Sequence, residues 1–71
     1  MSATESRKDI LNGVVVFKGT RVPVRNLFEY LVAGESIKDF MEDFPTVSFE
    51  QIREVLLRAE IAIEKEDEKA A

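Results

Sequence analysis

Carboxylates are the most numerous groups in this chain that could do chemistry. The sequence holds 14 aspartate and glutamate residues but no histidine and no cysteine. A pair of carboxylates can catalyse as acid and base, but a carboxylate on a solvated surface keeps an ordinary pKa and has no catalytic leverage. Helical spacing places most of these residues on polar faces: Asp39, Glu42, Asp43, Glu50, Glu54 and the stretch Glu64 to Glu68. We therefore expect a binding protein and not an enzyme.

Other kinds of reactive site are also missing from the sequence. Without histidine and cysteine a zinc site is not expected, and no glycine-rich loop is present that could hold a phosphate. The sequence therefore predicts no cofactor, no metal and no small-molecule substrate.

Three basic residues form the best candidate for a charged contact. Lys18 and Arg21 flank an expected chain reversal, and Arg25 follows at the start of an expected helix. Guanidinium groups bind phosphates and carboxylates through paired hydrogen bonds, so this trio could contact DNA or an acidic partner. An equally weighted alternative is structural, with Arg21 bonded to the carbonyls at a helix end.

The charge distribution limits where a nucleic acid could bind. The net charge is −4, yet residues 1–25 carry five basic residues against two acidic ones. The rest of the chain is acidic and is poorly suited to lie along a phosphate backbone. Any contact with DNA is therefore expected to start from the N-terminal third.

The last two expected helices could form a helix-turn-helix. Its second helix would offer Gln51 and Arg53 to DNA, but Glu50 and Glu54 on the same turns would repel phosphates. We favour the alternative in which this helix is a packing element.

Apolar residues outside the core stripes predict a partner surface. Leu57 and Ile61 lie opposite the core side of the third expected helix, and Tyr30 lies off the main stripe of the first. A chain of 71 residues buries a small core and has no disulfide or metal to support it, so association would supply stability. We expect a homodimer or a protein partner to cover these residues, although Leu57 and Ile61 could instead be covered within one subunit.

The elements that position these residues follow from local signals. A strand is expected at 14–17 and a second extended segment at 20–24, forming a short ribbon. Helices are expected from 24 to 33, closed by Gly34, from the N-cap Ser36 to the residue before Pro45, and from 49 onwards behind a capping box of Ser48 and Gln51. The core stripe of the third helix is Ile52, Val55, Leu56, Ala59 and Ile63. The predicted fold is mainly α with a short N-terminal β-ribbon.

This pattern indicates one domain with polar ends. Residues 1–9 are expected to be a flexible leader, 10–63 the folded domain and 64–71 an acidic helix end or tail. The chain has no apolar run long enough for a membrane span and no secretory signal, so we expect a cytoplasmic protein.

Three short motifs together resemble a known prokaryotic family, the domain-of-unknown-function family numbered 433. They are Gly19-Thr20-Arg21-Val22-Pro23-Val24, Gly34-Glu35-Ser36 and Asp43-Phe44-Pro45-Thr46-Val47-Ser48. The resemblance covers residues 10–63. It implies a homeodomain-like three-helix domain of the helix-turn-helix type, usually dimeric.

The resemblance also implies a role. Members of this family are often encoded beside nuclease-like toxins of the PIN-related type, so it implies an antitoxin that binds such a toxin, with a further role in repressing its own operon. Two alternatives remain at this stage: a DNA-binding transcriptional regulator that acts alone, and a purely structural dimerisation domain.

Overall fold

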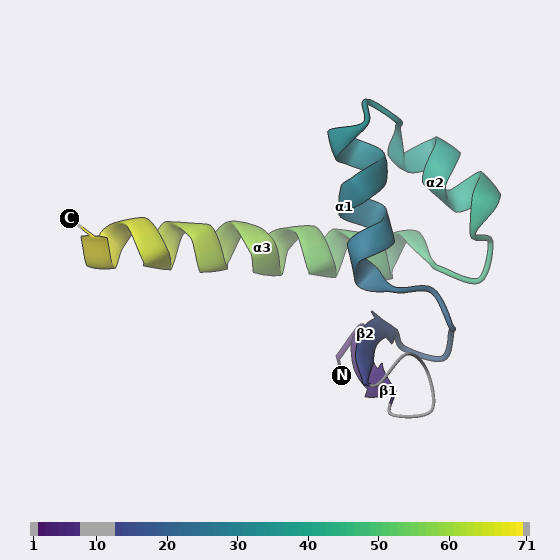
Figure 1. The fold of residues 1–71 in the computed structure, drawn as a ribbon, viewed down its shortest axis with the longest axis horizontal. Helices are drawn as coiled ribbons and strands as arrows, with labels where there is room; N and C mark the ends of the chain where they lie inside the picture. The colour runs from purple at the N-terminus through teal and green to yellow at the C-terminus, as the bar shows by residue number, and fades with distance from the viewer. Residues whose placement is uncertain (1, 8–12, 71) are drawn as a thin grey trace.

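The computed structural model describes residues 2–7 and 13–70. Its elements in chain order are β1 (Thr4–Arg7), β2 (Val14–Phe17), α1 (Val24–Val32), α2 (Ile37–Asp43) and α3 (Phe49–Ala70). Figure 1 shows α1, α2 and the ribbon gathered around the N-terminal part of α3, while the C-terminal part of α3 projects beyond them. The predicted fold class, mainly helical with a short antiparallel ribbon at the N-terminal end, is confirmed.

The strand that pairs with β2 is not the one that the sequence predicted. β1 runs antiparallel to β2, with Thr4 opposite Phe17 and Arg7 opposite Val14. The segment 20–24 contributes only an isolated bridge between Val16 and Pro23. Proline has no N–H to donate, which explains why no ladder forms on that side.

The prediction of a flexible leader is therefore wrong for residues 4–7, which form β1. This segment is held by backbone hydrogen bonds and not by an apolar face, so the hydrophobic pattern could not reveal it. Residues 1, 8 and 9 of the predicted leader lie outside the described residues.

The helix ends follow the predicted signals. Gly34 has a φ of 89°, and the N–H groups of Gly34 and Glu35 donate to the carbonyls of Leu31 and Tyr30, which closes α1 in a Schellman motif. Ser36 and Asp39 form a reciprocal capping box at the start of α2. Ser48 and Gln51 do the same for α3, with the Gln51 N–H 3.2 Å from Ser48 Oγ and the Ser48 N–H 3.0 Å from Gln51 Oε1.

The core lies between α1, α2, the N-terminal part of α3 and the end of β2. Its buried members are Phe17, Leu27, Phe40, Val47, Ile52 and Val55. Phe40 is fully buried, and its ring centroid lies 6.0 Å from that of Phe17 and 4.9 Å from that of Phe44.

Two residues of the predicted core stripe of α3, the partly buried Ala59 and the exposed Ile63, lie outside this cluster. The stripe of α3 was expected to include Ile63, but the side chain of Ile63 is 60% exposed. Its position around the helix is that of the core stripe. The C-terminal part of α3 projects beyond the other elements (Figure 1), and the side chain of Ile63 is correspondingly exposed.

Candidate interaction surfaces

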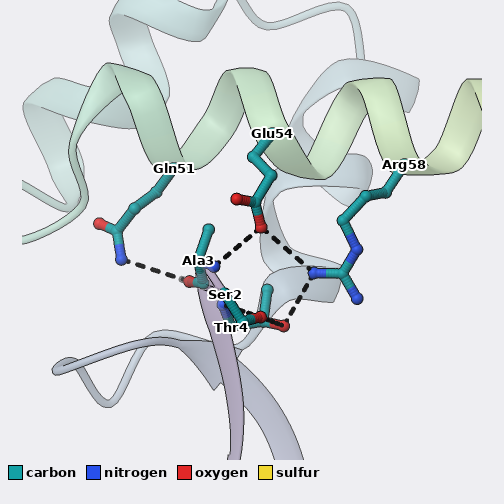
Figure 2. A network of polar contacts seen from close by, with 6 residues as sticks. All are labelled: Ser2, Ala3, Thr4, Gln51, Glu54 and Arg58. Carbon is teal, nitrogen blue, oxygen red and sulfur yellow. Dashed lines mark hydrogen bonds and ion pairs between the residues drawn. The ribbon is translucent and has the colours of Figure 1, made fainter.

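The N-terminal segment is attached to α3 by polar contacts (Figure 2). Gln51 Nε2 donates to the Ala3 carbonyl at 3.3 Å, and the Ala3 N–H donates to Glu54 Oε2 at 2.8 Å. Arg58 Nη1 donates to Thr4 Oγ1 at 3.0 Å and lies 3.5 Å from Glu54 Oε2. Residues 51, 54 and 58 are spaced by three and four, so they share one side of α3. This side positions the ribbon on the helix.

Gln51 is therefore occupied within the chain. Besides Ala3, its Nε2 donates to the Lys18 carbonyl at 3.0 Å, while its Oε1 accepts from Ser48. The prediction of Gln51 as a free contact for DNA is not supported by this geometry, because both ends of the amide already have partners.

The other predicted basic contacts are exposed but do not form one cluster. Lys18 and Arg21 lie on the turn after β2, and Arg25 lies on the first turn of α1, where its Nε is 3.5 Å from Glu29 Oε1. Arg53 lies on α3, two residues from Gln51, so the two side chains point to different sides of the helix. Within the part of the chain that the structure describes, Arg21 makes no hydrogen bond or ion pair, so the bonds to helix carbonyls considered for it are not found.

Exposed apolar side chains line the outer side of α3, as predicted. Leu57 is 42% exposed and Ile61 is 51% exposed. Phe49 is 48% exposed and, with the exposed Arg53, extends the same row at intervals of four residues. We call Phe49, Arg53, Leu57 and Ile61 the outer row. Counting back from Leu57 in steps of four along the sequence would have added Phe49 to this surface.

Tyr30 does not belong to the outer row. Its ring packs edge-on against Phe40 and Phe44, at centroid distances of 5.3 and 5.7 Å. Its hydroxyl donates to Asp43 Oδ2 at 2.6 Å, and this bond raises the pKa of Tyr30 above its ordinary value because it favours the protonated form. Tyr30 therefore stabilises the contact between α1 and α2. It does not lie beside Leu57 and Ile61, where it was predicted.

An apolar groove runs between the ribbon, α1 and α3. Its walls are Val15, Val24, Phe28, Val55, Ala59 and Ala62. Thr4 and Arg58 also line it, and its volume is about 390 Å³. Val15 is 49% exposed, whereas the next residue, Val16, is buried under the ribbon. No local signal in the sequence marks this groove as a whole, although the alternation of side chains along a strand predicts opposite faces for these two valines.

Within 2–7 and 13–70, no group of three or more histidine, cysteine, aspartate or glutamate side chains could hold a metal ion. The pKa of Asp39 is lowered, first by the hydrogen bond from the Ser36 N–H, which is part of a helix cap. In the described chain, no helix is both long enough and apolar enough to span a membrane.

Comparison with known proteins places the chain in a family. It is 40% identical over 55 residues to the uncharacterized protein y4eO of Sinorhizobium fredii (strain NBRC 101917 / NGR234). That match covers 78% of this chain but only 25% of y4eO, so the chain spans about a quarter of the length of this relative. No solved structure matches it. The family described as "Protein of unknown function (DUF433)" matches residues 5–57, across the ribbon, α1, α2 and the first half of α3, and the chain belongs to that family.

Proposed function

We propose that this chain is a non-catalytic protein-binding module that acts in the cytoplasm as an antitoxin. Its partner is a nuclease-like toxin of the PIN-related type encoded beside it, as the family resemblance implies. The outer row is the surface that binds the toxin. The observation that supports this proposal is the exposure of Phe49, Leu57 and Ile61 on one side of a helix whose other sides hold the core and the ribbon.

The composition of the outer row suits a protein partner. Large groups of exposed apolar side chains, especially beside polar residues, commonly mark sites of protein association. Aromatic residues and arginine are enriched among the residues that carry most of the binding energy of an interface. Phe49 and Arg53 supply both types, and Leu57 and Ile61 extend the apolar contact along the helix.

A DNA-binding regulator receives less support. Glu50 and Glu54 lie on the leading turns of α3, and the Gln51 amide is engaged by Ala3 and Lys18. The exposed side chains of Lys18 and Arg21 remain available for a phosphate backbone. They would contact the operator DNA when the complex with the toxin represses the operon.

The test is co-expression of the chain with the product of the adjacent reading frame. We expect the two proteins to elute together on size exclusion, and the nuclease activity of the partner to be suppressed. Leu57→Asp should weaken the complex at least about tenfold, because a charge would replace a buried contact of the interface.

Val32→Asp is the matched control. Val32 is 89% exposed on α1, away from the outer row, so this variant should bind the partner as the wild type does. Separate elution of the two proteins, together with salt-dependent binding of the chain alone to the DNA upstream of its own frame, would favour the regulator instead.

A further inference from the structure

The groove and the C-terminal end of α3 both expose apolar side chains, and these two surfaces cannot contact each other within one chain. The groove is apolar and open, and the half-exposed Val15 forms part of its wall. The end of α3 carries Ile63, which has the position of a core residue but is 60% exposed. Val55, Ala59 and Ala62 of the same helix form one wall of the groove, so a straight α3 leads away from the groove and cannot fold back into it (Figure 1).

We propose that the groove of each chain is filled by the end of α3 from a second copy. In this arrangement the two α3 helices run antiparallel about a two-fold axis, and Ile63 of each copy lies against Val15 and Phe28 of the other. The apolar stripe of α3 thus makes contacts in both copies. Ile52 and Val55 pack in the core of their own chain, and Ile63 packs in the groove of the second copy. An interface of this kind uses the same patch twice, as two-fold dimers do.

The charges of the two surfaces are complementary. The sequence of the end of α3 holds five carboxylates, Glu60, Glu64, Glu66, Asp67 and Glu68, against the two cations Lys65 and Lys69. Arg58 lines the groove, and Arg25 of α1 lines an adjoining hollow that shares Val15, Val24 and Phe28 with it. Arg25 lies 3.5 Å from the exposed Glu29, whereas Arg58 lies 3.5 Å from the partly buried Glu54 and also donates to Thr4. A guanidinium has five N–H donors, so each arginine keeps donors for carboxylates of a second copy.

Two further features fit a helix as the occupant. Ala59 and Ala62 are small, which leaves room for the backbone of a second helix to approach α3 closely. The last turns of α3 have no body to pack on, and a helical segment without tertiary packing is marginal in water. Seating in the groove of a second copy would supply that packing.

The first experiment measures mass by sedimentation equilibrium from about 1 μM to about 1 mM. The wild type should reach twice the 8.1 kDa of one chain. Ile63→Glu and Val15→Glu should each raise the dissociation constant of the dimer about tenfold or more, because each places a carboxylate within the apolar contact between Ile63 and Val15. Ile61→Glu is the matched control, since Ile61 belongs to the outer row, and it should leave the dimer unchanged.

A second experiment does not depend on whether a charge variant folds. The chain has no cysteine of its own, so single cysteines can be placed without background. A mixture of Val15→Cys and Ile63→Cys chains, treated with a short bis-maleimide, should give a cross-linked dimer of the two variants. A mixture of Val15→Cys with Ile61→Cys should give much less.

Several results would overturn the proposal. They are a wild type that stays at 8.1 kDa up to the highest concentration, a dimer that Ile61→Glu breaks and Ile63→Glu does not, and equal cross-linking in both cysteine mixtures. Because the groove and the outer row lie on different sides of α3, failure of this proposal leaves the toxin-binding proposal untouched. Loss of toxin binding in Leu57→Asp likewise says nothing about the groove.

Discussion

At the scale of single residues, Gln51 shows how one side chain can join distant parts of the fold. Its Oε1 accepts from Ser48 at the start of α3, and its Nε2 donates to the carbonyls of Ala3 and Lys18. A cap needs only the acceptor, so glutamate would serve equally well for the helix alone. The amide N–H groups are what connect the helix to the N-terminal segment and to the turn after β2.

Gln51→Glu separates these two roles. The variant keeps an acceptor for Ser48 but loses both donated bonds, and it places a carboxylate against two carbonyl oxygens. We expect the free energy of unfolding to fall by about 1–3 kcal/mol, measured by urea denaturation. Glu50→Gln changes the neighbouring exposed residue and should stay within about 0.5 kcal/mol of the wild type. A Gln51→Glu chain as stable as that control would show that the amide contributes nothing to the attachment.

At the scale of elements, each described helix has a capping or helix-breaking residue within a few positions of at least one of its termini. Gly34 supplies the positive φ that closes α1, and Pro45 follows the end of α2. Ser36 and Asp39 start α2 by satisfying each other's backbone N–H groups. This capping box carries a charge, so it makes the stability of the helix depend on pH.

The pH dependence follows from the direction of the shift. The bond from the Ser36 N–H lowers the pKa of Asp39 in the folded chain below its ordinary value. A carboxyl group with a lowered folded pKa adds stability above its unfolded pKa, and that stability is lost as the pH falls through the folded pKa. Asp39→Asn keeps an acceptor without a titrating group. Between about pH 5 and pH 2, its free energy of unfolding should therefore fall less steeply than that of the wild type.

Chemical denaturation at a series of pH values measures this difference. Glu42→Gln removes a carboxylate from the same helix, outside the capping box, and should keep the slope of the wild type. Identical slopes for Asp39→Asn and the wild type would contradict a role for the capping box in acid unfolding.

At the scale of the whole molecule, the C-terminal part of a long helix projects beyond a small core (Figure 1). The ribbon is part of what closes that core, because β1 covers the edge of β2 while Val16 and Phe17 are fully buried. Residues 4–7 are therefore a structural part of the domain. The far end of α3, by contrast, adds nothing to the packing of its own body (Figure 1).

Truncations at the two ends should have opposite consequences. Deletion of residues 1–7 removes β1 and its contacts with Glu54 and Arg58, and uncovers one edge of β2. We expect the free energy of unfolding to fall by at least about 3 kcal/mol, which is a large share of the stability of a small domain. Thermal unfolding followed by circular dichroism measures this change. Deletion of residues 68–71 should change the midpoint temperature of unfolding little. An N-terminal deletion that unfolds at the temperature of the intact chain would mean that β1 is dispensable.

The sequence by itself determined the helices and their ends. Gly34, the pair Ser36 and Asp39, Pro45, and the pair Ser48 and Gln51 all act on backbone groups within four residues, so their effect can be read without knowing the fold. The exposure of Leu57 and Ile61 was also predictable, because the period of a helix fixes which residues lie opposite its core stripe.

Only the tertiary structure decided which segments meet. β1 pairs with β2 in place of the segment 20–24, Gln51 reaches partners 33 and 48 residues away, and Tyr30 packs on α2. Ile63 continues the core stripe past the end of the body, and Val15 faces a groove that three separate elements build. These features depend on contacts between residues far apart in the chain, and the local period and turn signals of a sequence carry no information about such contacts.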